Sequence, residues 1–290
     1  MMTLDERIEK DLTELYNGGK LNGIISDANT LSTGLFGSLN ELSACGMPGH
    51  FTGNRDADTV IVMLNPGKDV ENANKQESTK EMLKKLNIDT KTLDSFITTY
   101  KKGNENFGNL SKGSAFDVKQ ARFLAPWEDS GISFPSEFPV NNNTYLGAKK
   151  AVLLQKLQLE LVPYCSKTFE INTKNIKILI PYIETLFHEI FSKKRKYILF
   201  CGNVFEELFS VFNDVSSNSI VMRNYEEGPV ITKTSKGTDV VSHCQIITIN
   251  YNGEQHNALI ANSFAHRRLT GNKMSNYGKF CYDTYINSKI

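Results

Sequence analysis

The sequence lacks several features that would place a protein in a class at once. Its 5 cysteines among 290 residues are odd in number and include no CxxC pair. This pattern is typical of reduced, buried thiols rather than of disulfides or a cysteine-ligated zinc or iron–sulfur site. The 20 glycines and 8 prolines are too few for a collagen or a linker protein. No run of about 18 apolar residues occurs, and the charged N-terminal segment lacks the apolar stretch of a secretory signal. We therefore expect a globular, cytoplasmic protein without a membrane segment.

An excess of charge of one sign is also missing. Lys and Arg number 33, and Asp and Glu number 32, which gives a formal net charge of +1. A nucleic-acid partner would therefore be held by a local basic patch and not by the overall charge. Among the basic clusters, His266-Arg267-Arg268 is the strongest candidate for such a patch, because it directly follows a predicted buried strand.

Several common catalytic motifs are absent as well. The chain has no GxxxxGKS/T phosphate loop, no GxGxxG after its first predicted strand, no GxSxG nucleophile turn and no HExxH pair. These absences disfavour a P-loop enzyme, a dinucleotide-binding fold and an α/β-hydrolase. The five histidines are too scattered to indicate a metal site. We expect neither a metal nor a cofactor.

Short apolar runs bounded by turn residues predict buried strands at 59–64, 157–162, 197–201 and 257–261. Residues 219–250 predict further β structure, with turns at Gly228-Pro229 and Lys236-Gly237. Helical spacing of apolar residues predicts helices at 3–17, 148–157, 174–192, 204–212 and 274–288. Strands that alternate with helices indicate an α/β fold, with three α/β/α layers around a short, mostly parallel central sheet. We prefer one domain over residues 1–290, with a helical or irregular insertion at about 70–146, to two domains.

Three of the predicted strands end in polar turns built from small residues. The segments are MLNPGKD at 63–69, FCGN at 200–203 and ANSFAHRR at 261–268. Ligands of open α/β sheets bind beyond the carboxyl ends of the strands. We therefore expect these three turns to converge at one edge of the sheet.

Two of these segments carry a resemblance to a known family. A strand followed by N-P-G at 59–67, and a strand followed by N-S-x-A-H-R-R at 257–268, resemble the two motifs of the uracil-DNA glycosylase superfamily, in particular its mismatch-specific branch. Between them, YILFCGNVFEEL at 197–208 resembles an apolar run of that family. The segment LQLELVPYCSK at 157–167 is similar to the strand whose polar residue reads the flipped base in other branches. The resemblance covers four short segments.

The chain also departs from the family pattern. Phe264-Ala265 stands where many members have Pro and Ser or Gly, and the 70–145 insertion is larger than in compact members. The cysteines do not match the iron–sulfur branches, so no cluster is expected. The resemblance implies a uracil-DNA glycosylase-like fold. It also implies a monofunctional DNA N-glycosylase that acts on DNA as a monomer and needs neither a metal ion nor a membrane.

The first motif would position the water that attacks the glycosidic bond. The resemblance implies that Asn65 holds this water while the Pro66-Gly67 turn offers backbone N–H groups. An amide is no strong general base, so catalysis would depend on electrostatics and positioning. Asp69 is the reserve candidate for a carboxylate base, and Lys68 is a candidate DNA contact. The alternative is that Asn65 merely caps the strand before an ordinary turn.

The second motif would contact the base and the DNA backbone. His266 can donate to a base carbonyl or contact a phosphate, while Arg267 and Arg268 can bind phosphates or fill the gap left by the extruded base. Ser263 can hold a phosphate, and Asn262 beside it is a candidate substrate contact. The alternative is a basic surface turn. A weaker pocket candidate, at the end of the strand at 197–201, is Asn203.

Glu160 bears on which base is recognised. It offers a carboxylate where uracil-directed relatives offer an amide. A carboxylate only accepts hydrogen bonds, which suits an exocyclic amine such as cytosine N4. Specificity would then move toward cytosine or a modified cytosine, unless Glu160 pairs with a lysine or faces solvent. Tyr164 or Phe123 can stack on the base, although both residue types are usually found in the core.

Three functions remain open from the sequence. The first is a DNA glycosylase that removes a damaged, mismatched or modified base in repair or in defence, since the large insertion suggests an unusual substrate such as a bulky modified base on foreign DNA. The second is a non-catalytic nucleic-acid-binding protein that keeps the fold. The third is an enzyme that acts on free nucleosides or nucleotides.

Overall fold

The computed structural model describes residues 2–18, 48–64, 91–105, 114–134, 142–164, 176–213, 218–233, 235, 237–264 and 269–288. The chain divides into two compact units. Unit 1 comprises residues 1–52, 64–105 and 159–192, and unit 2 comprises 53–63, 106–158 and 193–290. The described parts of the predicted 70–146 insertion are shared between the two units, since 91–105 belongs to the first and 114–134 to the second.

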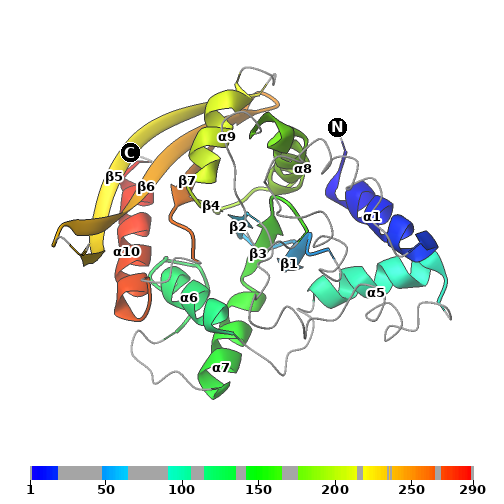
Figure 1. Cartoon of the computed structure of the whole chain (residues 1–290), viewed down its shortest axis with the longest axis horizontal. Helices are drawn as coiled ribbons and strands as arrows, with labels where there is room; N and C mark the ends of the chain where they lie inside the picture. The colour runs from blue at the N-terminus through cyan, green and yellow to red at the C-terminus, as the bar shows by residue number, and fades with distance from the viewer. Residues whose placement is uncertain are drawn as a thin grey trace. The chain divides into compact units, whose positions relative to one another are not determined.

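One sheet of seven strands runs through the fold in the order β1-β3-β2-β4-β7-β6-β5 (Figure 1). The first two strands in this order are β1 (Phe51–Gly53) and β3 (Lys156–Glu160). Strand β2 (Thr59–Met63) pairs in parallel with β4 (Tyr197–Cys201), and β4 pairs in parallel with β7 (Glu254–Ala261). Strands β6 (Asp239–Tyr251) and β5 (Ser219–Lys233) continue the sheet in antiparallel pairing. The α/β class is therefore confirmed, but the sheet is longer and more mixed than the expected short, mostly parallel one.

The central strands form where the sequence predicts them because their side chains are apolar on both faces. All five residues of β2 and all five of β4 are buried. The β structure predicted at 219–250 corresponds to β5 and β6, which lie side by side along their length (Figure 1). Gly228-Pro229 does not form a turn, because the pair lies inside β5 at a register shift between Glu227 and Val230. There Ser242 donates its hydroxyl to the Pro229 carbonyl at 2.8 Å.

Four helices flank the sheet residues of unit 2. They are α6 (Ala115–Leu124), α7 (Asn142–Leu153), α9 (Val204–Phe212) and α10 (Asn272–Asn287). A capping box between Ser114 and Asp117 begins α6, and α10 packs closely on α6. Trp127, Phe123, Tyr197 and Tyr277 form an aromatic core on this face. On the other face, Phe205 and Phe209 of α9 pack on Phe200 of β4.

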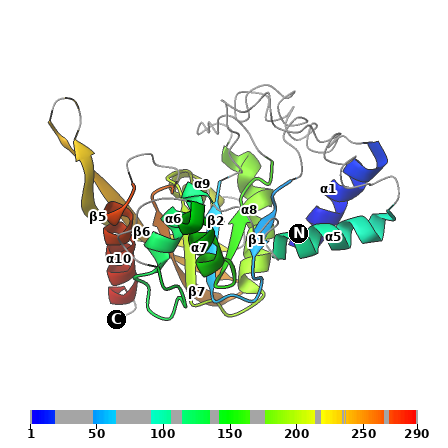
Figure 2. The same cartoon turned by 90° about the horizontal axis from the view of Figure 1, so that it is seen from below.

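Unit 1 contains the helices α1 (Leu4–Gly18), α5 (Leu93–Glu105) and α8 (Ile180–Phe191). The stripe Leu4, Ile8, Leu12 and Leu15 is buried, as the helical spacing predicts, and α1 lies beside α5 in both views (Figure 2). The helix predicted at 174–192 begins as a 3-10 turn, η3 (Ile176–Leu179), and becomes α-helical at Ile180. Pro181 explains this boundary, because proline fits only the first turn of an α-helix. Within the described residues, no helix combines the length and apolarity required to cross a bilayer.

Candidate functional site

The carboxyl ends of three parallel strands meet at one edge of the sheet in unit 2. The register pairs Val62 of β2 with Phe200 of β4, and Cys201 of β4 with Ala261 of β7. The N–H of Gly202, just beyond β4, donates to the Ala261 carbonyl at 2.8 Å. The predicted convergence of the strands at 59–64, 197–201 and 257–261 is therefore confirmed for the strands themselves.

Gly202 makes the turn at this edge possible. Its φ angle of 138° lies in the region that side chains with a Cβ rarely adopt. The chain thus leaves β4 sharply and enters α9 after only two residues, Gly202 and Asn203. Asn203 is exposed, and its side chain makes no helix-capping bond.

The catalytic centres of both predicted motifs lie outside the described residues. These positions are Asn65, Pro66, Gly67, Lys68, Asp69, His266, Arg267 and Arg268. Of the second motif, the structure describes Asn262, Ser263 and Phe264, which lead from β7 into that segment. Ser263 is half-buried, whereas Asn262 and Phe264 are buried.

Asn262 is held on three sides. Its side-chain Oδ1 accepts the backbone N–H of His243 at 2.9 Å, and its Nδ2 lies 3.2 Å from His243 Nδ1. Its own N–H donates to the Tyr277 hydroxyl at 2.6 Å, and that hydroxyl donates to the His243 carbonyl at 2.7 Å. Burial raises the pKa of the Tyr277 phenol well above its usual value, so the hydroxyl keeps its proton.

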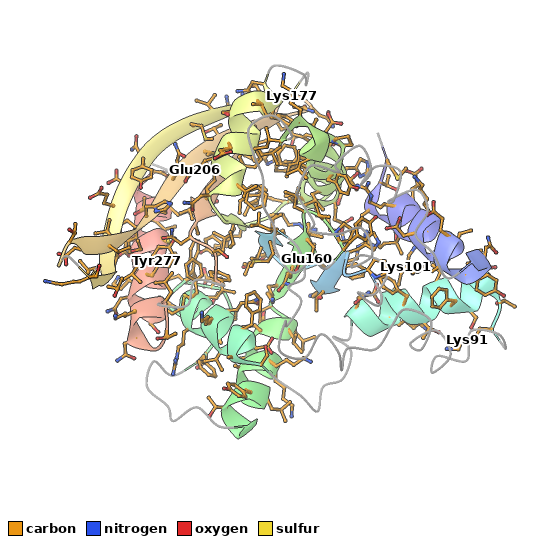
Figure 3. All side chains as sticks on the ribbon, viewed as in Figure 1. Lys91, Lys101, Glu160, Lys177, Glu206 and Tyr277 are labelled. Carbon is orange, nitrogen blue, oxygen red and sulfur yellow. The ribbon has the colours of Figure 1, made fainter. Side chains whose placement is uncertain are left out.

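A histidine and a glutamate that the sequence analysis did not select complete this cluster. Nε2 of His243 lies 3.6 Å from Oε1 of Glu206, which is in the first turn of α9. The Tyr225 ring stacks on the imidazole, with the ring centroids 5.3 Å apart. Partial burial, together with the carboxylates of Glu206 and Glu227, raises the pKa of the Tyr225 phenol. Figure 3 shows Glu206 on α9 and Tyr277 on α10, the two helices that contribute to the cluster.

No local signal in the sequence could have identified His243 as part of the site. Cys244 of β6 is the register partner of Ala261 of β7, which brings the preceding His243 next to Asn262. This pairing depends on hydrogen bonds between strands and not on any spacing in the sequence. Glu206 was visible in the run GNVFEEL, but nothing in that run indicates a histidine opposite it.

Phe264, the residue after Ser263, is held by contacts with the core. Phe264 is fully buried and packs on Phe123 with ring centroids 4.8 Å apart, and its carbonyl accepts from Lys119 Nζ at 3.0 Å. Phe123 is itself fully buried against Trp127 and Tyr277. The structure therefore corrects the suggestion that Phe123 stacks on a base, because the ring is part of the core.

Unit 1 contains the other two described candidates, Glu160 and Tyr164. Glu160 ends β3 (Lys156–Glu160) and is 8% exposed, and its N–H donates to the His50 carbonyl at 3.2 Å. Val162 donates its N–H to the Leu64 carbonyl at 2.9 Å. The end of β3 therefore lies beside the residue that precedes Asn65. Figure 3 labels Glu160 among the side chains of the sheet.

Tyr164 belongs to a buried hydrogen-bond network. Its hydroxyl donates to Oδ2 of Asp11 at 2.7 Å, and His50 Nε2 lies 3.0 Å from the same oxygen. Burial raises the pKa of the Tyr164 phenol well above its usual value. Burial also lowers the pKa of His50, although Asp11 opposes the shift. This placement does not favour the suggested stacking of Tyr164 on a base, since the side chain is 3% exposed.

The described cysteines, Cys201, Cys244 and Cys281, are buried and form no disulfide with one another. Burial and a contact with Cys244 raise the pKa of the Cys281 thiol well above its usual value, so it stays protonated. In the part of the chain that the structure describes, no three His, Cys, Asp or Glu side chains are grouped so as to hold a metal ion.

Comparison with known proteins adds no relative: no protein-family model matches the chain, and no curated protein matches its sequence.

Proposed function

We propose that the protein is a monofunctional DNA glycosylase that extrudes a base from DNA and hydrolyses its N-glycosidic bond. The observation that supports this most directly is the parallel β2-β4-β7 arrangement. It brings the strand ends that precede the N-P-G segment and the N-S-F-A-H-R-R segment to one sheet edge. Neighbouring strands lie roughly 4.8 Å apart, so two strand intervals separate these ends by roughly 10 Å.

The chemistry needs a water below the anomeric carbon and hydrogen-bond donors for the departing base. In this proposal Asn65, two residues beyond β2, orients the water, and His266 donates to the base or to a phosphate. Arg267 and Arg268 contact the DNA backbone. The base must leave the stack first, because the glycosidic bond cannot be reached inside the duplex.

Within this proposal, Glu160 recognises the extruded base and so determines which class of base is removed. A carboxylate at the end of β3 accepts hydrogen bonds and donates none, which suits the exocyclic amine of cytosine or of a modified cytosine. The bond between Val162 and Leu64 supports this assignment, since it places the end of β3 beside the segment that leads to Asn65.

The test is excision by the full chain and by an Asn65→Ala variant. Duplex and single-stranded DNAs carrying uracil, mismatches, and plain or hypermodified cytosines are incubated with the protein, and released bases are identified by mass spectrometry. We expect release of one base class by the wild type and a loss of at least about 100-fold in rate for Asn65→Ala, because a positioning and electrostatic group is removed. DNA binding should be largely retained.

The matched control is Asn287→Ala, which removes an exposed asparagine at the end of α10. It should excise at the wild-type rate. Equal rates for Asn65→Ala and the wild type would overturn the mechanism. Binding of DNA without release of any base from the panel would instead favour a non-catalytic nucleic-acid-binding protein.

A further inference from the structure

Arg122 of α6 is a buried cation for which the described residues supply no anion. It is 6% exposed, and its Nε is shielded from solvent and has no hydrogen-bond partner. Within the described part of the chain, its guanidinium takes part in no hydrogen bond or ion pair. A guanidinium keeps its charge in folded proteins, and a buried charge is costly unless an opposite charge compensates it. The burial of Arg122 therefore points to a ligand that supplies the negative charge.

The guanidinium lies beside the N-terminal end of α10, which packs on α6 in the same unit (Figure 1). A Cβ built on Gly271, the residue that precedes α10, would lie 4.0 Å from Nη1 of Arg122. Apart from the chain neighbours of Gly271, no other atom of the described residues lies within 4 Å of that position. The space beside Gly271 is therefore open, and Arg122 forms one side of it.

The N-terminal end of α10 is itself suited to an anion. Its N-cap residue is Gly271, with a φ angle of 56°, and no side chain caps the helix. The N–H groups of the first turn and the helix dipole place partial positive charge at this end of a 16-residue helix. The first turn contains no acidic residue, and it includes Lys273, whose Nζ donates to the Ile231 carbonyl at 2.6 Å.

We propose that Arg122 and the N-terminal end of α10 form a binding site for a phosphate group. A guanidinium offers a planar fork of N–H donors that matches phosphate oxygens, and the helix end adds backbone N–H groups directed at the same anion. Bound phosphate supplies the counter-charge that Arg122 otherwise lacks. That the phosphate belongs to the DNA backbone rests on the proposed function, because Gly271 follows Arg268 by three residues.

The site is tested first without DNA. Inorganic phosphate is titrated into the full chain at constant ionic strength, held with chloride, and its affinity is measured by calorimetry and by the rise in Tm. Phosphate should raise the Tm of the wild type, because it binds the folded state. Arg122→Met should bind phosphate at least about tenfold more weakly, since charge-assisted hydrogen bonds are lost.

The stability of Arg122→Met separates a ligand site from a structural role. Without phosphate this variant should unfold at the wild-type Tm or above it, because an uncompensated buried charge is replaced by an apolar side chain. A purely structural arginine would instead lower the Tm when replaced. Arg223→Met is the matched control, since it makes the same change at an exposed position of β5 and should leave phosphate binding unchanged. Equal phosphate affinity in Arg122→Met and the wild type would overturn the proposal.

A second variant keeps Arg122 and alters the helix end. Asn272→Asp places a carboxylate at the exposed first residue of α10, where negative charge favours the helix. The variant should fold, and it should bind phosphate roughly threefold more weakly because the carboxylate competes for the same helix end. If Arg122→Met fails to fold, an Asn272→Asp affinity equal to that of the wild type overturns the site.

Duplex DNA and deoxyadenosine 5′-monophosphate then distinguish the two sources of the phosphate. If the source is DNA, Arg122→Met should bind the duplex with a slope of log affinity against log salt that is smaller by about 0.9. Weaker binding of the nucleotide with an unchanged duplex slope would overturn DNA as the source and assign the site to a free nucleotide.

Base release is measured separately, so the two proposals can fail independently. If phosphate binding depends on Arg122 and no DNA loses a base, the proposed function fails and the phosphate site stands. If bases are released and phosphate binds Arg122→Met as it binds the wild type, the phosphate site fails and the glycosylase assignment stands.

Discussion

At the scale of single residues, burial decides which polar groups can act. Tyr164 and His50 carry chemically capable side chains, yet both are buried in unit 1 within 3.0 Å of the Asp11 carboxylate. Asn262 and His243 form a similar network in unit 2, but His243 and its partner Glu206 remain partly open to solvent. The first network therefore belongs to the core of unit 1, whereas the second lies where β7 ends.

The His50 network predicts a pH dependence of stability. Burial lowers the pKa of His50 in the folded state, so the unfolded chain binds a proton more readily than the folded one. The stability that His50 contributes is complete above the unfolded pKa of about 6.5 and is lost as pH falls toward the lower folded value. Over that window the free energy of unfolding should fall by up to about 1.4 kcal/mol per pH unit.

Urea unfolding at several pH values between 7.5 and 5 measures this slope. His50→Gln should have a flatter profile than the wild type, whereas His188→Gln, which changes an exposed histidine on α8 of the same unit, should not. Identical slopes for His50→Gln and the wild type would show that other groups are responsible.

At the scale of elements, α10 packs closely on α6, and this packing positions Tyr277, whose hydroxyl accepts the N–H of Asn262. Gly278 makes this approach possible, because a Cβ at this position would lie 2.1 Å from the Phe123 carbonyl oxygen and 2.8 Å from the Phe123 Cα. Backbone atoms of α6 cannot yield as the end of a flexible side chain can. The glycine is therefore required by packing and not by helix propensity.

Gly278→Ala should lower the free energy of unfolding by about 3 kcal/mol, because overpacking forces the two helices apart. Gly147→Ala in α7 is the control, since nothing lies within 4 Å of its Cβ position. That exposed helical position should gain up to about 1 kcal/mol from the better helix former. Urea denaturation of both variants gives the comparison, and a Gly278→Ala variant as stable as the wild type would rule out the tight contact.

At the scale of the whole molecule, the near-neutral charge limits how DNA can be held. A net charge of +1 supplies little general attraction, so affinity must come from a few phosphate contacts. In the proposed function Arg267 and Arg268 provide two of them. Each contact releases counterions and adds about 0.9 to the slope of log affinity against log salt.

The Arg267→Ala, Arg268→Ala double variant should therefore bind duplex DNA with a slope smaller by about 1.8. Fluorescence anisotropy at several salt concentrations measures it. Lys279→Ala removes a lysine that Asp283 already engages at 3.0 Å and should leave the slope unchanged. A double variant with the wild-type slope would exclude this loop from the phosphate contacts.

The sequence by itself determined the elements whose pattern is local. The buried strands β2, β4 and β7 and the helices α1 and α9 follow from apolar runs and helical spacing. The convergence of the strand ends followed as well, because parallel strands joined by helices share their carboxyl edge.

Only the tertiary structure determined which residues contact one another. His243 reaches Asn262 through the register of β6 against β7, and Gly228-Pro229 becomes an irregularity inside β5 because Ser242 binds it across the hairpin. Phe123 and Tyr164 were plausible base contacts in the sequence and proved to be core residues. Burial and strand register arise from contacts between distant segments, and these leave no periodic signal in the sequence around each residue.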